Sequence, residues 1–302
     1  MNIMGSSPEP ESTITNVDLD HTGKAMLDDI YSQADPRLYF QTLRPLDYSI
    51  PGYAHPYFSA LVNRLSEIRK GGQVRAIDLG CSYGINSALL KLGLSYERLV
   101  DNYADAEFEN LSRKELIERD RGLIAERAGT SPHMTGVDIS QPALEYGIDA
   151  GYLDEAILAD LESNDLSAAN RRHLVGTDLV ISTGCIGYVG AETIRRLLEG
   201  MGDARPWSAH FVLRMFAFDE IAAVFSERGY ETIPLPGLFK QRKFVSSEER
   251  NEVTATLNEQ GFDTSGLEET GYFFAQMHLT IPDEDMDSAR DLISAWRRVS
   301  MA

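Results

Sequence analysis

The chain has 302 residues, of which 43% are hydrophobic and 25% charged, and its formal net charge at pH 7 is −19. This length and composition are typical of a globular protein with one elaborated domain or a domain plus a small subdomain. Because a strongly acidic chain repels a phosphate backbone, we expect no nucleic acid partner. No apolar run approaches the roughly 20 residues that span a bilayer, so we expect no membrane partner either.

The only two cysteines, Cys81 and Cys185, lie far apart in the sequence. They form no disulfide framework and suit the reducing cytosol, so we expect a cytoplasmic protein. The six histidines are scattered without ligand spacing, which predicts that there is no metal site.

The first 72 residues divide into two predicted regions. Residues 1–23 are polar, acidic and rich in Pro and Ser, which predicts a loose tail. Residues 24–72 have a helical pattern and are unusually aromatic. Seven of the 28 residues from Tyr31 to Phe58 are Phe or Tyr, against 9% aromatic residues in the whole chain. The segment suits a helical cap over a ligand site, or equally a helix pair that packs on a sheet.

Residues 73–302 predict a Rossmann-like α/β domain with a mainly parallel sheet and helices on both faces. Short apolar runs alternate with helical segments, which is the pattern of a parallel sheet covered on both sides. We expect strands at residues 74–79, 134–138, 156–159, 178–182 and 210–215. The long aromatic run at 272–281 predicts an antiparallel terminal strand in the edge region. A helical insertion is expected at about residues 95–130, because the first and second strands lie far apart in the sequence.

A glycine-rich turn follows the first predicted strand, with the sequence Asp78-Leu79-Gly80-Cys81-Ser82-Tyr83-Gly84. In a strand–turn–helix unit, glycine lets the backbone turn tightly and approach a ligand, and the helix beyond offers free N–H groups. Asp138 ends the second strand and Asp160 the third. Open α/β sheets bind ligands at this carboxyl edge.

This segment resembles the first motif of the class I S-adenosylmethionine-dependent methyltransferases, with Ser82 in place of the central glycine. The resemblance implies that the turn wraps the methionine part of S-adenosylmethionine and that Asp78 helps to hold its amino group. It also implies that Asp138 binds the ribose and Asp160 the adenine amino group. The residues expected to bind this cofactor are Asp78, Gly80, Cys81, Ser82, Gly84, Asp138, Ile139, Asp160, Leu161, Ser182 and Thr183. We therefore expect a methyltransferase that acts on a small molecule, by analogy in specialised metabolism.

Several residues are candidates for the substrate side. Tyr188, His55 and Tyr31 are the catalytic candidates, and Arg37, Tyr39, Tyr188 and Arg242 are the candidates for substrate binding. Each has a plain alternative: Tyr188 and His55 as structural residues, Arg37 beside a helix start capped by Asp35, and Arg242 in a solvated loop. Cys185 has no visible partner for a role as catalytic thiol.

Two other functions stay open at this point. The same pocket could direct attack at the aminobutyrate chain of the cofactor and cyclise it to azetidine-2-carboxylate. The chain could also be a non-catalytic module that binds S-adenosylmethionine or a nucleotide. The stretch from Met286 to Val299 suits either a helix at the interface of a homodimer or a cover for the edge of the sheet.

Overall fold

The computed structural model describes residues 18–104, 108, 110–126 and 131–299. Residues 1–17 of the predicted tail lie outside the described residues. Residues 18–23 belong to an N-terminal strap, which we define as residues 18–32. The strap begins with a turn in which the Lys24 carbonyl accepts a hydrogen bond from the Asp20 N–H at 2.7 Å.

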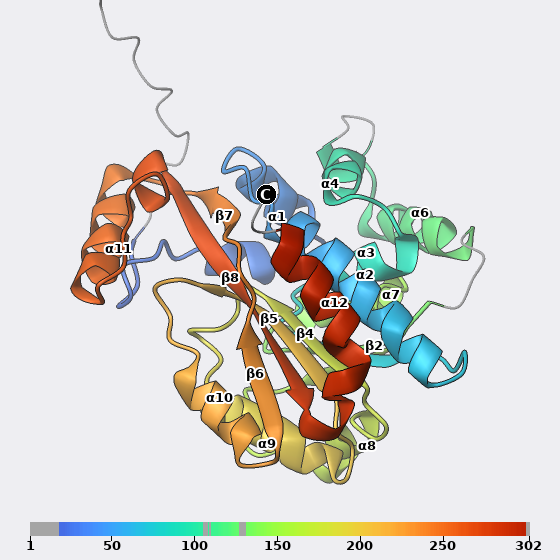
Figure 1. Cartoon of the computed structure of the whole chain (residues 1–302). Helices are drawn as coiled ribbons and strands as arrows, with labels where there is room; N and C mark the ends of the chain where they lie inside the picture. Colours follow the sequence, from blue (N-terminus) through green and yellow to red (C-terminus); the bar gives the residue numbers. More distant parts are fainter. Residues whose placement is uncertain (1–17, 105–107, 109, 127–130, 300–302) are drawn as a thin grey trace, which may run out of the picture.

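One sheet of eight strands forms the centre of the molecule (Figure 1). The strands are β1 (Arg75–Leu79), β2 (His133–Asp138), β3 (Glu155–Leu158), β4 (Leu179–Thr183), β5 (Trp207–Leu213), β6 (Tyr230–Pro234), β7 (Phe239–Lys243) and β8 (Tyr272–Pro282). Their order is β3-β2-β1-β4-β5-β8-β6, and β7 also pairs with β8. Strands β1 to β5 are parallel, whereas β8 runs antiparallel to its neighbours β5, β6 and β7. The predicted Rossmann-like sheet is therefore confirmed.

The terminal strand differs from expectation in its place. It is antiparallel as predicted, but it lies inside the sheet, because β6 pairs with its outer side. The sequence reasoning missed both β6 and β7. Strand β7 has the sequence Phe-Lys-Gln-Arg-Lys, which lacks the apolar alternation that predicts a strand.

Helices cover both faces of this sheet (Figure 1). The α-helices are α1 (Arg37–Leu43), α2 (Ile50–Ile68), α3 (Ile85–Leu92), α4 (Tyr96–Ala104), α6 (Arg113–Ala125), α7 (Gln141–Asp149), α8 (Ala168–His173), α9 (Ala191–Met201), α10 (Asp219–Ser226), α11 (Ser247–Glu259) and α12 (Met286–Val299). Short 3₁₀ helices occur at η1 (Asp28–Tyr31), η2 (Glu268–Thr270) and η3 (Asp283–Asp285). Helices α4 and α6 fall within the predicted insertion.

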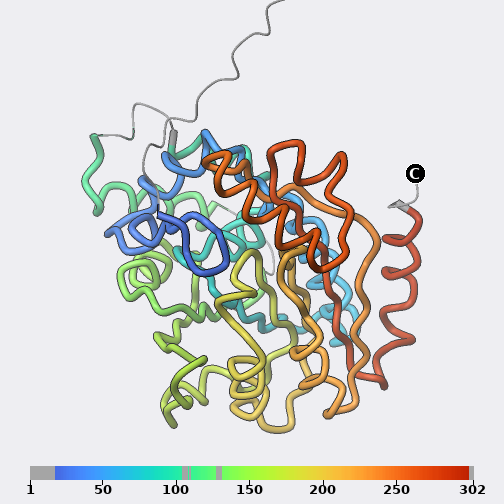
Figure 2. Tube along the Cα trace, turned by 90° about the vertical axis from the view of Figure 1, so that its left-hand side faces the viewer, coloured from blue at the N-terminus to red at the C-terminus, as the bar shows by residue number. Residues whose placement is uncertain are grey.

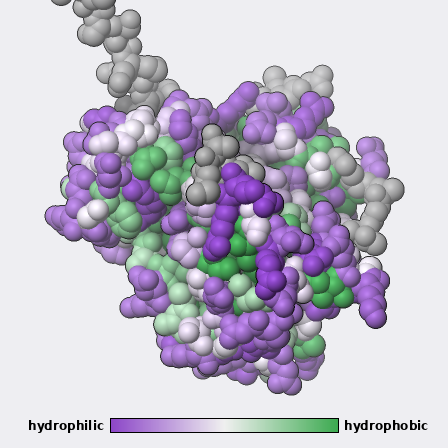
Figure 3. Space-filling view, in the orientation of Figure 1, coloured by the Kyte–Doolittle hydropathy of each residue, from purple (hydrophilic) through white to green (hydrophobic). Residues whose placement is uncertain are grey.

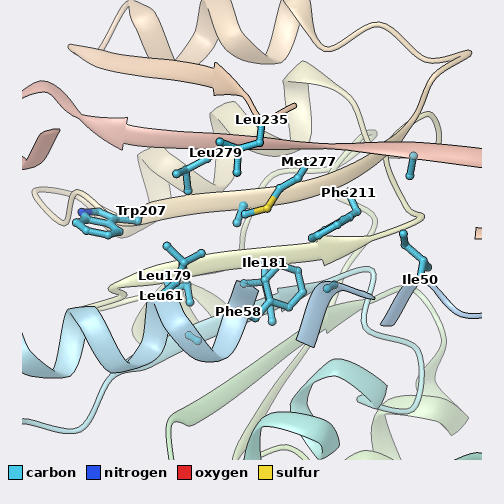
Figure 4. Close-up of a cluster of buried hydrophobic side chains, with 14 of the residues drawn as sticks. Ile50, Phe58, Leu61, Leu179, Ile181, Trp207, Phe211, Leu235, Met277 and Leu279 are labelled. Carbon is cyan, nitrogen blue, oxygen red and sulfur yellow. The ribbon is translucent and has the colours of Figure 1, made fainter. Parts of the chain in front are cut away.

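The two faces are defined by the alternation of side chains along the strands. Leu179 and Ile181 of β4 pack in one core cluster with Phe58 and Leu61 of α2 (Figure 4). Val180, between them, belongs to the opposite cluster with residues of α9 and α10. Successive side chains of a strand point to opposite faces, so a strand buried on both faces is apolar throughout.

The predicted cap thus divides into two parts. Helix α2 packs against the sheet, as the alternative of a packed helix proposed, whereas the strap and α1 lie beside the carboxyl ends of the strands. Helix α12 also covers the sheet, since Ala289 and Ile293 are buried in the same cluster as α2. In Figure 2, α12 runs along the side of the molecule opposite the strap.

The surface seen in Figure 3 is mainly hydrophilic, and hydrophobic side chains gather there in separate patches. Within the described residues, no helix combines the length and apolar character needed to cross a membrane.

Candidate active site

A large cavity opens where the strand order reverses, between β1 and β4. This switch point is where doubly wound α/β sheets bind their ligands. The cavity measures about 1070 Å³, slightly above the roughly 300–1,000 Å³ of a pocket for one drug-sized ligand. Its wall has two parts. We call one part the turn side, which comprises residues 79–82, 137–142 and 159–163. We call the other part the strap side. It comprises the strap residues that line the cavity, together with Tyr39, Leu43, Tyr48, Pro51, Tyr188, Gln241 and Arg242.

The turn after β1 is built from left-handed residues at alternate positions. Gly80, Ser82 and Gly84 have φ angles of 63°, 50° and 80°. A Cβ on Gly80 would lie 2.5 Å from the Cβ of Cys185, so only glycine fits there. Ser82 adopts a conformation that costs a non-glycine residue energy. The residue lines the cavity, and its buried Oγ has no hydrogen-bond partner within the described part of the chain.

Asp138 joins the ends of β1 and β2. Its carboxylate accepts hydrogen bonds from the backbone N–H groups of Ser82 at 2.7 Å and Ser140 at 2.9 Å. Burial raises its pKa above the ordinary value, although these hydrogen bonds oppose the shift. Ile139, next to it, is 73% exposed and lines the cavity. The pair offers an acceptor for hydroxyl groups beside an apolar surface.

Asp160 stands at the end of β3 and also lines the cavity. Its Oδ1 accepts hydrogen bonds from the N–H groups of Glu162 and Ser163 at 3.1 and 3.2 Å. Hydrogen bonds from Ser163 are the main cause of its lowered pKa, so the carboxylate is ionised at neutral pH. Leu161 is buried beside it, and both residues face the same space as Ile139.

Three predicted cofactor residues lie behind this wall. Asp78 is fully buried and accepts hydrogen bonds from Asn86 Nδ2 at 3.2 Å and Ser87 Oγ at 2.9 Å. Asn86, not Asp78, lines the cavity. Burial raises the pKa of Asp78 to about 6. Asp78 therefore does not line the cavity as predicted, and its carboxylate instead holds the side chain of Asn86, which does.

The other two residues behind the wall have structural partners. The Ser182 hydroxyl is buried against His210 Nδ1 at 2.7 Å, and Gly84 begins α3. The remaining predicted cofactor residues all line the cavity, namely Gly80, Cys81, Ser82, Asp138, Ile139, Asp160, Leu161 and Thr183.

Aromatic rings dominate the strap side. The ring of Tyr39 lies 5.9 Å from that of Tyr31 and 6.2 Å from that of Tyr48, centroid to centroid. All three rings line the cavity. Burial raises the pKa of Tyr31 to about 12, so its hydroxyl is neutral and a poor base. The aromatic segment therefore does reach the cavity, as a wall of neutral phenols.

Tyr188 faces this wall from the loop after β4. Its hydroxyl donates a hydrogen bond to Asp20 Oδ2 at 2.7 Å. Burial and the hydrogen bond to Asp20 both raise the pKa of Tyr188 well above its usual value. Burial would raise the pKa of Asp20, but hydrogen bonds from Thr22 and Tyr188 outweigh it and lower that pKa. The Asp20 carboxylate, rather than the Tyr188 phenol, is the ionised group of the pair.

Arg242 lines the cavity but is not in a solvated loop. It is buried on β7, and its guanidinium lies within 2.6 and 2.9 Å of the two carboxylate oxygens of Glu249. Glu249 also accepts hydrogen bonds from the Ala25 and Val245 N–H groups, each at 2.7 Å. This pair joins the strap to β7 and α11.

Two substrate-side predictions need correction. His55 lies on α2, outside the described residues that line the cavity, so it is not placed to act as a base there. Arg37 also lies outside that lining, because its guanidinium pairs with Asp35 at 2.7 Å and donates to the Leu111 carbonyl at 2.8 Å. Cys185 does line the cavity. Burial raises the pKa of its thiol to about 12, which leaves it protonated and weakly nucleophilic.

Comparisons with known proteins give similarity of fold at low identity. No family model matches the chain, and no curated protein matches it. Magnesium protoporphyrin IX methyltransferase of Synechocystis, solved with bound S-adenosylmethionine, is 12% identical over 89% of this chain and 100% of its own, with a TM-score of 0.42. A TehB-like S-adenosylmethionine-dependent methyltransferase of Corynebacterium glutamicum is 13% identical over 72% and 86%, with a TM-score of 0.35. The plantazolicin methyltransferase, solved with S-adenosylhomocysteine, is 12% identical over 77% and 85%, with a TM-score of 0.38.

Sequence reasoning missed several residues of the cavity wall. Lys24, Asp20, Asn86 and Gln241 all line it, whereas Tyr48, which also lines it, belongs to the aromatic segment of the predicted cap. The Asp-His-Thr-Gly sequence at residues 20–23 is a turn signal that could have shown an ordered strap. No local pattern marks Lys24 or Gln241. Among the described residues, no group of three or more His, Cys, Asp or Glu side chains could hold a metal ion.

Proposed function

We propose that this protein is an S-adenosylmethionine-dependent methyltransferase whose acceptor is a small molecule. One observation carries the proposal. The glycine turn, Asp138 and Asp160 line the same continuous cavity as the aromatic wall of the strap side. A cofactor site on the turn side and an acceptor site on the strap side therefore share one space.

The residues of the turn side fit the cofactor. The unpartnered Ser82 Oγ and the side chain of Asn86 offer polar contacts to an amino-acid end. Asp138 is placed at the end of β2 to accept hydrogen bonds from ribose hydroxyls. Ile139 and Leu161 form an apolar slot for a purine ring, with the ionised Asp160 at its margin.

The chain's own part in the reaction is mainly to position and to exclude water. When bound, S-adenosylmethionine supplies a methyl carbon activated by its sulfonium. Aromatic faces such as those of Tyr31 and Tyr48 suit a cation, and a closed aromatic wall keeps water from the reacting centre. Holding an acceptor in line accounts for a large part of the rate enhancement in such a transfer. In this mechanism the acceptor proton passes to the Tyr188 oxygen as the Tyr188 hydroxyl proton passes to its hydrogen-bond partner Asp20.

The size of the cavity favours transfer to a second molecule over cyclisation of the cofactor. Cyclisation needs room for one ligand, whereas the cavity of about 1070 Å³ continues from the turn side to the strap side. A non-catalytic module that binds only the cofactor would also not need the second, aromatic part of the cavity on the strap side. A place in specialised metabolism, a cytoplasmic location and a homodimer stay predictions.

Product analysis tests the proposal. The protein is incubated with S-adenosylmethionine and a panel of small aromatic acids and phenols, and the nucleoside products are separated by liquid chromatography. We expect S-adenosylhomocysteine to form only when an acceptor is present. Methylthioadenosine formed without an acceptor would establish cyclisation instead, and tight binding without any product would favour the non-catalytic module.

A further inference from the structure

Lys24 is a buried lysine on the wall of the cavity. Its backbone is held in place on both sides: the Lys24 N–H donates to Asp20 Oδ1 at 3.1 Å, and the Ala25 N–H donates to Glu249 Oε1 at 2.7 Å. Only 7% of the residue is exposed. The lysine therefore does not swing freely into solvent.

The ammonium group has aromatic neighbours. Lys24 Nζ lies 4.7 Å from the centroid of the Tyr188 ring and 5.9 Å from that of Phe216. In the part of the chain that the structure describes, Lys24 Nζ has no carboxylate oxygen within 4.0 Å. A buried charge without a counter-charge is costly, so buried lysines are normally paired.

The nearest acidic groups are engaged elsewhere. Glu249 forms its ion pair with Arg242 at 2.6 Å. Asp20 accepts hydrogen bonds from the Thr22 hydroxyl at 2.6 Å and the Tyr188 hydroxyl at 2.7 Å. Burial and the charge of Arg242 lower the pKa of Lys24 to about 8, while Asp20, Glu249 and Cys185 oppose that shift. Most of the lysine is therefore still protonated at neutral pH.

A second polar group on the strap side lacks a partner. Gln241 is 4% exposed and lines the cavity, and its Oε1 has no hydrogen-bond partner among the described residues. The strap side thus combines an ammonium without a carboxylate, an amide with an unmet hydrogen bond and the rings of Tyr31, Tyr39 and Tyr48.

We propose that Lys24 forms an anion subsite that takes the carboxylate of a planar aromatic acceptor, and that Gln241 provides a second polar contact in the same cavity. The carboxylate supplies the counter-charge that Lys24 lacks, and a hydroxyl or ring N–H of the ligand donates to Gln241 Oε1. The tyrosine rings pack against the aromatic part. This inference rests on the proposed function, since it assigns the acceptor class of the same cavity.

Calorimetry with paired probes tests the subsite. 4-Hydroxybenzoate, 4-hydroxycinnamate and indole-3-acetate are titrated into the protein with saturating S-adenosylhomocysteine, each beside its uncharged carboxamide. We expect at least one acid to bind about 10- to 100-fold more tightly than its amide, because a hydrogen bond to a charged group is lost in the amide. Lys24→Met, and independently Lys24→Gln, should abolish this preference. Lys114→Met, a change at an exposed lysine of α6, should retain it.

The outcomes separate the two proposals. Equal binding of acid and amide, persistence of the preference in both Lys24 variants, or no binding of any acid would overturn the anion subsite. Binding of S-adenosylhomocysteine alone is measured first on each variant and reports that the protein is folded. Failure of the wild type in that first titration would overturn the methyltransferase proposal, whatever the acids do.

Discussion

The two sides of the cavity are built in different ways. The turn side consists of consecutive residues at the ends of neighbouring parallel strands, and backbone N–H groups of these same strand ends hold each carboxylate, as at Asp138 and Asp160. The strap side is assembled from residues as distant in the sequence as Lys24, Tyr188 and Gln241. Glu249 is a tertiary hub of this side, because it links the strap to β7 and α11. The residues of the proposed cofactor site thus lie on the regular geometry of the sheet edge, whereas those of the proposed acceptor site come together only through long-range packing.

The largest expected effect comes from breaking that hub. Glu249→Ala leaves the buried Arg242 charge unpaired and releases the Ala25 N–H, so we expect the free energy of unfolding to fall by about 3–5 kcal/mol. Denaturant unfolding measures the loss. The neighbouring exposed residue provides the control, since Glu248→Ala should change stability by about 0.5 kcal/mol or less. Equal effects of the two substitutions would contradict the role of Glu249 as a hub.

The corresponding break on the turn side is Gly80→Ala. The new Cβ would meet Cys185 while the backbone keeps a positive φ, so we expect a loss of about 3 kcal/mol and weaker binding of S-adenosylhomocysteine. Gly151→Ala is the matched control, because Gly151 has a φ of 79° and no atom near its added Cβ. This substitution should lower the free energy of unfolding by about 1–2 kcal/mol, which is the cost of a non-glycine residue in the left-handed conformation. A Gly80→Ala variant no less stable than Gly151→Ala would refute the packing account.

The pH dependence of stability isolates the buried acid behind the turn side. The folded protein holds the Asp78 proton up to a pKa of about 6, whereas the unfolded chain releases it near 3.8. Between these values the folded state binds more protons, so this residue makes stability fall as pH rises from about 4 to 6, by up to about 3 kcal/mol. Asp78→Asn should lack that decrease. Unfolding curves at pH 4, 5, 6 and 7 test it, and a constant difference between the two proteins would be the contrary result.

A smaller and opposite effect is expected at Ser82. Ser82→Gly relieves a left-handed conformation and should raise the free energy of unfolding by about 1 kcal/mol. Because it also removes the unpartnered Oγ, it should weaken binding of S-adenosylhomocysteine by about 10-fold. Ser82→Ala, which keeps the strain but loses the hydroxyl, should weaken binding without the gain in stability. Binding unchanged in both variants would mean that Oγ does not contact the ligand.

The same contrast explains how much could be predicted from sequence. The five parallel strands and the turn side were predictable because their signals are local: short apolar runs, glycines and an acid at each strand end. The position of β8 inside the sheet was not, because β6 and β7 give weak strand patterns and their pairing is non-local. Asp78 lies in the predicted segment, but it does not line the cavity as predicted. The side chains of Asn86 and Ser87 on α3 cover its carboxylate, and the packing of α3 is not visible in the local sequence.

Only some residues of the strap side could be predicted from local sequence patterns. Tyr31, Tyr39, Tyr188 and Arg242 were predicted as candidates, and all four line the cavity. Lys24 and Gln241 carry no motif, so only the burial and the missing partners seen in three dimensions single them out. His55 and Arg37 were predicted from their side-chain chemistry, but neither lines the cavity. His55 lies on α2, and Arg37 is paired with Asp35.

In the proposed function, the turn side binds S-adenosylmethionine through Asp138. Calorimetry with S-adenosylhomocysteine on the wild type, Asp138→Ala and the surface control Glu220→Ala tests it most directly. We predict micromolar binding by the wild type and by Glu220→Ala, with affinity reduced by about 10- to 100-fold or more in Asp138→Ala, because hydrogen bonds to a carboxylate are lost. No binding by the wild type, or equal binding by all three proteins, would contradict the assignment of the cavity.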